Sequence, residues 1–150
     1  MPEKKVKSIT SFRDLEVYQN SYKACIEVMK RIIPNLPDSE KFDLKKQLSS
    51  SVKAIPRLIA EGYAKRHQKH GFQKYLDDAM AECNETIVGI EMCKDIFGKY
   101  IDMKLREELV SIYDVCGRQL YRLREAWADS QEKAINKIIL YPCPLTKLAS

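Results

Sequence analysis

The sequence predicts an all-α protein, an antiparallel up-down-up-down four-helix bundle followed by a C-terminal tail. Apolar residues recur at three- and four-residue steps over four long stretches, the spacing that places them on one face of a helix. Only six prolines and five glycines occur in 150 residues. Because the connections between the stretches are short, consecutive helices should run antiparallel.

The composition fits one soluble domain. The chain is long enough to bury a core, and its 45% hydrophobic and 31% charged residues argue against disorder. No run approaches the ~20 apolar residues of a membrane span. The start Met-Pro-Glu-Lys-Lys lacks the apolar segment of a secretory signal. We therefore expect a cytoplasmic protein that does not contact a membrane.

The five cysteines are an odd set with no Cys-x-x-Cys pair, which excludes a zinc ribbon or a thioredoxin-type motif. Four of them fall on apolar helix faces, so we expect reduced, buried thiols. The five are Cys25, Cys83, Cys93, Cys116 and Cys143.

The first helix follows a flexible arm, residues 1–10. Ser11 or Thr10 can cap the helix, and Asp14 lies in its first turn, where the helix dipole favours a carboxylate. The segment Pro34–Pro37 ends it, since residues before proline avoid the α region. Its predicted core stripe is Leu15, Tyr18, Tyr22, Cys25, Ile26, Met29, Ile32 and Ile33.

The second helix should begin at Asp38 or Ser39 and end near residues 65–71. Pro56 lies inside it, and its missing N–H and bulky ring should kink the helix. The apolar stripe keeps its phase on both sides of the proline, so we expect one bent helix and not two. The stripe is Leu44, Leu48, Val52, Ile55, Ile59 and Gly62.

The third and fourth helices carry regular stripes, and a tail follows them. The third is Phe72, Leu76, Ala79, Cys83, Thr86, Ile90, Cys93 and Phe97, ended by Gly98. The fourth is Leu105, Leu109, Ile112, Cys116, Leu120, Leu123 and Trp127. The bundle thus covers 11–128. The tail, 129–150, either packs along its own bundle or docks on a neighbouring subunit or partner.

The charges of the second and third helices have opposite sign. Residues 44–70 hold seven Lys or Arg against one acid, whereas residues 71–98 hold two against six acids. The basic face can bind a phosphate backbone, or it can meet the acidic face of another subunit. A merely solvated surface is the third reading. The candidate nucleic-acid-binding residues are Lys45, Lys46, Lys53, Arg57, Lys65, Arg66 and Lys69.

The sequence offers no catalytic or metal-binding set. His67 and His70 are spaced three apart, but no cysteine or carboxylate completes a ligand set beside them. No Gly-rich phosphate loop, Gly-x-Ser-x-Gly or His-Glu-x-x-His occurs. Glu61 and Glu85 are expected to be structural, partly buried carboxylates. We predict a protein that is not an enzyme and uses no cofactor or metal.

Three motifs resemble the bacterial four helix bundle protein family, the ribosomal-RNA intervening-sequence proteins. The segment Ser11-Phe-Arg-Asp-Leu-Glu-Val-Tyr-Gln19 is similar to its opening. The segment Ala54-Ile-Pro-Arg-Leu-Ile-Ala-Glu-Gly62 resembles its Ser-Ile-Pro-x-Asn-Ile-Ala-Glu-Gly motif, with Ala54 and Leu58 in place of serine and asparagine. Phe72-Gln-Lys-Tyr-Leu76 with Ala79 and Glu85 resembles its third-helix pattern. The structural motif residues are then Pro56, Glu61, Gly62 and Glu85.

The resemblance covers residues 11–127 and implies a homopentameric barrel with a basic surface. It also implies a link to ribosomal RNA genes, or to the accessory variability protein of diversity-generating retroelements, which binds a reverse transcriptase and nucleic acid. We predict a non-enzymatic, oligomeric protein that binds structured RNA through the second helix. The alternative is a homo-oligomeric scaffold, for example a reverse-transcriptase accessory, with charge-paired subunit faces.

Overall fold

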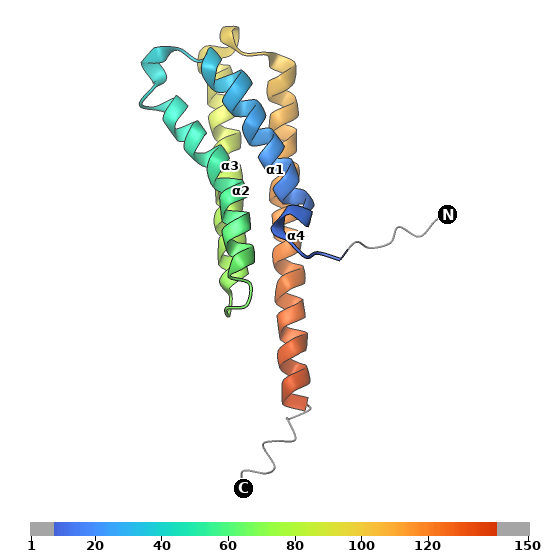
Figure 1. Cartoon of the computed structure of the whole chain (residues 1–150). Coiled ribbons are helices and arrows are strands. Elements are labelled where there is room, and N and C mark those ends of the chain that lie inside the picture. Colours follow the sequence, from blue (N-terminus) through green and yellow to red (C-terminus); the bar gives the residue numbers. More distant parts are fainter. Residues whose placement is uncertain (1–7, 141–150) are drawn as a thin grey trace, which may run out of the picture.

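The computed structural model describes residues 8–140 and confirms the all-α four-helix bundle. The long helices are α1 (Glu16–Glu27), α2 (Leu44–Ala64), α3 (Gly71–Phe97) and α4 (Met103–Leu140) (Figure 1). Short helical turns join or flank them, and the described part of the chain contains no strand. These turns are η1 (Phe12–Asp14), η2 (Val28–Ile32), η3 (Ile33–Asn35), η4 (Asp38–Glu40) and η5 (Gly98–Tyr100).

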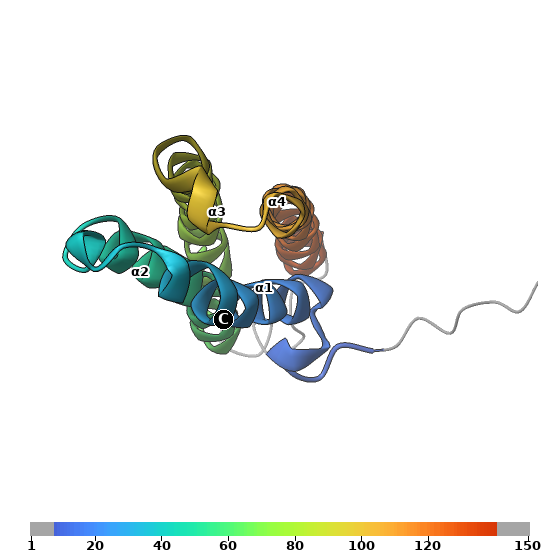
Figure 2. The same cartoon turned by 90° about the horizontal axis from the view of Figure 1, so that it is seen from above.

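The four helices alternate in direction. The most extensive packing joins α2 to α3 and α3 to α4. Seen end-on, α1 spans from α2 toward α4, and α3 lies on the opposite side (Figure 2). A hydrogen bond of 3.3 Å from Asn20 Nδ2 to Gln119 Oε1 joins α1 to α4. The predicted up-down-up-down order is therefore present.

The core lies between the four helices, and the α3 stripe is the prediction that fits best. All seven residues predicted from Phe72 to Cys93 are buried, and Phe97 is half-buried. The Phe72 ring packs edge-on against Trp127 of α4, with ring centroids 5.0 Å apart. On α4, Tyr113 is buried, whereas the predicted Ile112 is 37% exposed.

The predicted core stripe of the first helix is correct in part. Leu15, Cys25 and Ile32 are buried, but Tyr22 is 50% exposed. The buried residues of α1 also include Val17, Ser21 and Ala24, which the prediction omits. The helix carries two neighbouring apolar faces, and the face with the smaller side chains packs inward. Small side chains let the helix axes approach more closely, so Ser21 and Ala24 fit where tyrosines do not.

The start of α2 also differs from the prediction. Asp38 and Ser39 form the separate turn η4, and α2 begins at Leu44. The helix then continues through Pro56, which is itself buried. Figure 1 shows α2 changing direction along its length, as expected for a helix that contains a proline.

The last helix is longer than the sequence pattern indicates. It continues past Trp127 to Leu140, so the first part of the predicted tail is helical. The predicted arm lies mostly outside the described residues, as do residues 141–150. Ser11 caps the short turn η1 and not α1 itself, whose N-cap residue Leu15 makes no side-chain cap. Asp14 Oδ2 accepts hydrogen bonds from the N–H groups of Thr10 and Ser11.

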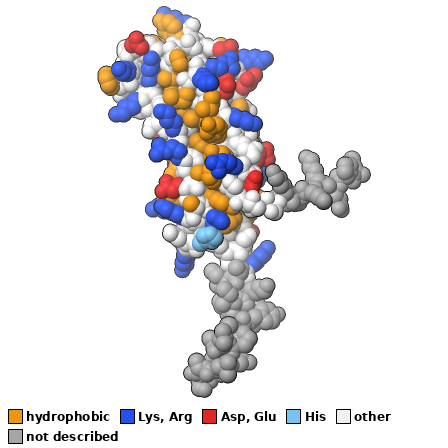
Figure 3. Space-filling view, in the orientation of Figure 1, with side chains coloured by type: hydrophobic (Ala, Val, Ile, Leu, Met, Phe, Trp, Pro, Cys, Tyr) orange, Lys and Arg blue, Asp and Glu red, His pale blue; other side chains and the backbone are white. Residues whose placement is uncertain are grey.

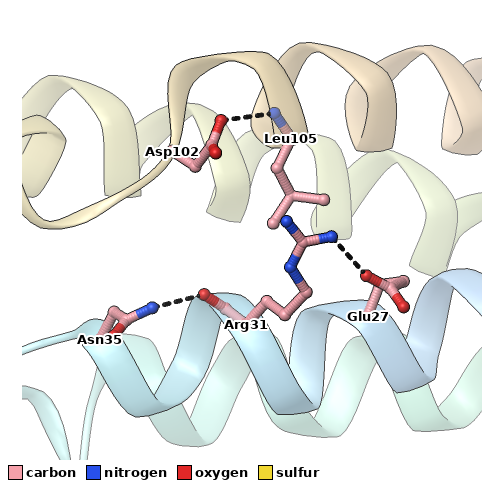
Figure 4. Close-up of polar contacts among 5 residues, drawn as sticks. All are labelled: Glu27, Arg31, Asn35, Asp102 and Leu105. Atoms are coloured by element: carbon pink, nitrogen blue, oxygen red, sulfur yellow. Dashed lines mark hydrogen bonds and ion pairs between the residues drawn. The ribbon is translucent and has the colours of Figure 1, made fainter.

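Polar side chains hold the helix ends where α1 meets the start of α4 (Figure 4). Asp102 Oδ1 accepts a hydrogen bond of 3.0 Å from the Leu105 N–H and so caps α4. Asn35 Nδ2 donates to the Arg31 carbonyl at 2.7 Å, and Arg31 pairs with Glu27 at 3.0 Å. None of the described helices combines the length and apolar character of a bilayer-spanning segment.

Four of the five cysteines are buried and free, as predicted, and the fifth, Cys143, lies outside the described residues. Burial raises the pKa of Cys83 from 9.0 to about 12. It raises the pKa values of Cys93 and Cys116 to about 11. An unfolded chain would ionise these thiols two or more pH units earlier, because water solvates the thiolate.

The protein should therefore lose stability as the pH rises above 9. Below pH 9 the thiols are neutral in both states. Between pH 9 and 11 only the unfolded state releases protons, which costs the folded state about 1.4 kcal/mol per pH unit for each thiol. Urea unfolding at pH 8 and 10 measures this loss. The Cys83→Ala variant should lose less over the same interval, and an equal loss would contradict the role of this thiol.

Candidate nucleic-acid interface

The outer face of α2 carries an exposed basic line, defined here as Lys46, Lys53 and Arg57. Helix phase places them opposite the buried residues Val52, Ile55 and Ile59. All three side chains are exposed, and none forms an ion pair within 4 Å with a described residue. Figure 3 shows Lys and Arg side chains along the side of the molecule that α2 occupies. These three cations are available to an anionic partner.

The other four candidate nucleic-acid-binding residues differ from the basic line in exposure and bonding. Lys45 is mostly buried and pairs with Asp38 at 3.3 Å. Arg66 Nη1 donates to the Tyr63 carbonyl at 2.8 Å, and its guanidinium lies 4.1 Å from the Tyr63 ring centroid. Lys65 is likewise bonded within the chain, whereas Lys69 is exposed in the turn between α2 and α3. Only Lys69 therefore extends the basic line.

Lys65 belongs to a polar cluster with Glu61 and Tyr75. Its ammonium pairs with Glu61 Oε1 at 3.2 Å and also donates to the Tyr75 hydroxyl. The Tyr75 hydroxyl donates to the same Glu61 oxygen at 3.2 Å. The hydrogen bond from Lys65, followed by that from Tyr75, lowers the pKa of Glu61. The cluster joins the end of α2 to the start of α3. Because the ammonium of Lys65 is paired with Glu61, it is less able to bind an external phosphate.

The expected burial of Glu61 and Glu85 is wrong. Glu61 is bonded as described, but its side chain is 54% exposed. Glu85 is exposed on α3, and its neighbour Thr86 is the buried polar residue, donating to Ser51 Oγ at 3.0 Å. The stripe through Cys83 and Thr86 faces the core, so the helical phase turns Glu85 outward.

At Gly62 the backbone of α2 lies close against α3. A Cβ at this position would stand 2.5 Å from the Tyr75 Cβ and 3.1 Å from a ring carbon of Phe72. Real Cβ atoms do not come so close, so the glycine permits this helix contact. The contact sets the position of the turn that carries Lys69.

An aromatic pair on α1 is a feature that the sequence interpretation missed. Tyr18 and Tyr22 stack with ring centroids 6.0 Å apart, and Tyr22 is half exposed. One turn further, burial raises the pKa of Cys25, and the nearby charge of Lys53 partly opposes that rise. The pair therefore lies on a helix that borders the basic line. No pattern within α2 could have revealed rings supplied by another helix.

The described residues contain no group of three or more His, Cys, Asp or Glu that could hold a metal ion. His67 and His70 are both exposed beside the α2–α3 turn. The groups that the outer face of α2 and the neighbouring α1 offer to a ligand are therefore lysine, arginine and tyrosine side chains.

Comparison with known protein families shows to which family the chain belongs. Residues 13–122 match the model of the 23S rRNA-intervening sequence protein family. The chain belongs to this family. A protein of unknown function from the S23 ribosomal protein family of Bacteroides thetaiotaomicron has a similar fold, with a TM-score of 0.61 and 22% identity. The match covers 73% of the present chain and 95% of that one. No curated protein matches this intervening-sequence protein.

Substituting Gly62 with alanine should destabilise the bundle, because the added methyl group forces α2 and α3 apart. Overpacking of this kind costs about 1–3 kcal/mol, which urea unfolding would measure. Gly98→Ala is the matched control, since a Cβ there meets no atom within 4 Å. A Gly62→Ala variant as stable as the Gly98→Ala variant would contradict the close approach.

Proposed function

We propose that this intervening-sequence protein is a non-enzymatic protein that binds structured RNA through the outer face of α2. The observation that supports this most directly is the basic line, Lys46, Lys53 and Arg57, with Lys69 beyond it. Exposed cations without intramolecular ion pairs attract phosphates and release condensed counterions when they bind. The contact is with the backbone, so it selects the shape of the RNA more than its sequence.

The tyrosine pair on α1 supports the same proposal. An exposed ring such as Tyr22 can stack on an unpaired base, and each such stack contributes about 1–3 kcal/mol. Phosphates on α2 and a base on α1 would be contacted together where an RNA helix ends in a loop or a single strand. The favoured ligand is therefore a hairpin or a duplex with unpaired ends.

Reversing two charges of the basic line should weaken RNA binding strongly. Lys53→Glu with Arg57→Glu removes two phosphate contacts and adds repulsion, so we expect a loss of roughly tenfold or more and a salt dependence that is shallower by about two. Fluorescence anisotropy with a labelled RNA hairpin, over a range of salt concentrations, measures both quantities.

The matched control is Lys94→Glu with Lys99→Glu, which makes the same change in charge at the far end of α3. Both control lysines are exposed. The control should bind the hairpin about as tightly as the parent. Absent affinity at low salt, or equal losses in the two variants, would contradict the proposal.

Self-association through charge-paired faces is the second candidate. The outer face of α3 exposes Val88, Met92 and Ile96 at four-residue steps among acidic residues. Partial burial, followed by the charges of Glu85 and Asp78, raises the pKa of Glu82. Cations from the α2 face of a second copy would relieve this repulsion, and the apolar residues would be covered.

Asp78→Lys with Glu82→Lys should break such an oligomer, because it places cations opposite cations. Light scattering would show a particle near the monomer mass for the variant and a larger one for the parent. Glu107→Lys with Glu108→Lys on α4 is the control and should leave the mass unchanged. A monomeric parent would exclude this candidate.

A further inference from the structure

A hollow of about 380 Å³ lies between the start of α3 and α4, beside the α2–α3 turn. Its volume is within the range of about 300–1,000 Å³ that is usual for ligand sites. Figure 1 shows α4 continuing past this turn. Five of the six side chains that line the hollow are polar, so it suits a polar ligand. The six are His70, Gln73, Lys74, Asp77, Arg124 and Ala128.

Gln73 is the residue of this hollow whose hydrogen bonding is incomplete. It is only 7% exposed, although glutamine is mostly found at the surface. Its Oε1 is buried and has no hydrogen-bond partner among the described residues. A buried amide oxygen without a donor costs free energy, so such an oxygen is normally bonded. The terminal torsion of glutamine is broad and roughly two-fold, so the amide can turn its oxygen or its nitrogen toward the hollow. A ligand with a donor beside an acceptor would satisfy both.

Arg124 lines the same hollow, and its guanidinium is held in place. Its Nε donates to Asp77 of α3, and its Nη1 donates to Glu125 Oε1 at 3.1 Å. Two carboxylates therefore fix the plane of the guanidinium and offset its charge. A guanidinium plane held in this way can stack on a flat ring. The exposed imidazole of His70 is a second flat group at the hollow. The hollow thus favours a planar ligand with a polar edge.

The charges beside the hollow favour a ligand that carries phosphate. Asp77, the carboxylate of the lining, is already bound to Arg124. Lys74 is exposed and forms no ion pair within 4 Å with a described residue. Lys69, which extends the basic line of α2, directly precedes His70 in the chain. Cations therefore continue from the outer face of α2 to the edge of the hollow.

We propose that this hollow binds an unpaired nucleotide of the RNA, with the base stacked on Arg124 and its edge hydrogen-bonded to the Gln73 amide. Unpaired bases are commonly recognised through stacking on arginine or histidine and through hydrogen bonds to their Watson–Crick edge. The phosphate next to the base pairs with Lys74. The site rests on the proposed RNA binding, and it adds a contact with a base that the cations of α2 cannot make.

The test compares two RNA duplexes with the same stem and a single-nucleotide overhang, adenosine in one and an abasic nucleotide in the other. Both carry the same phosphates, so the ratio of their affinities measures the base alone. Fluorescence anisotropy with the full-length protein should show the adenosine duplex bound roughly tenfold more tightly. In the Gln73→Met variant this ratio should fall severalfold, because methionine fills the same space without hydrogen bonds. The affinity for the abasic duplex should not change.

Gln68→Met is the matched control. Gln68 is exposed in the α2–α3 turn and does not line the hollow, so this variant should keep the ratio of the parent. Thermal unfolding should show that Gln73→Met is at least as stable as the parent, since the substitution removes a buried oxygen that has no donor. A clear loss of stability would mean that the amide is bonded within the chain, which contradicts the site.

An unchanged ratio in Gln73→Met would overturn the proposal, as would a parent that binds the two duplexes equally. If Lys53→Glu with Arg57→Glu still weakens both duplexes in that case, RNA binding through α2 is retained without the base contact. A parent that binds neither duplex at low salt would contradict RNA binding and this site together. Calorimetry with AMP gives a further outcome. Binding of AMP that the adenosine duplex does not displace would assign the hollow to a free nucleotide and reject the RNA contact.

Discussion

The contact between α2 and α3 at Gly62 is the constraint on which the rest of this bundle depends. It brings the α2 backbone against Tyr75 and Phe72, and Phe72 then packs between Tyr63 and Trp127. The same contact lets Lys65 and Glu61 reach Tyr75 across the two helices. The absence of a side chain at Gly62 therefore allows side chains from α2, α3 and α4 to pack together at this end of the bundle.

The sequence predicts the buried face well where one apolar stripe is long and regular. On α3, Leu76, Cys83 and Ile90 belong to a stripe that runs the length of the helix, and all three are buried. On α1, tyrosines and aliphatic residues offer a second stripe, and periodicity alone cannot choose between two apolar faces. The choice depends on how closely Ser21 and Ala24 allow the neighbouring helices to approach, which is a tertiary property.

Some features of the candidate site could be predicted from the sequence and others could not. The exposure of Lys53 and Arg57 follows from helical phase, so it could be predicted. The bond from Lys65 to Tyr75 could not, because the tyrosine comes from α3, and neither could the bond from Arg66 to a backbone carbonyl. The pair of Lys65 with Glu61, four residues earlier on α2, is the part that spacing alone suggests. The exposure of Glu85 follows from the phase of α3, since its neighbour Thr86 belongs to the buried stripe. Family membership thus predicts the fold more reliably than the role of each polar residue.

The hydrogen bond between Asn20 and Gln119 has a consequence for synthesis. It joins residues 99 positions apart, whereas α2, α3 and α4 pack on neighbours in the chain and can form from local contacts. As the chain leaves the ribosome from its N-terminus, α1 is made first, but its α4 partner is made nearly last. One side of α1 therefore stays uncovered until almost the whole bundle has emerged, and the closing of α1 onto α4 completes the fold.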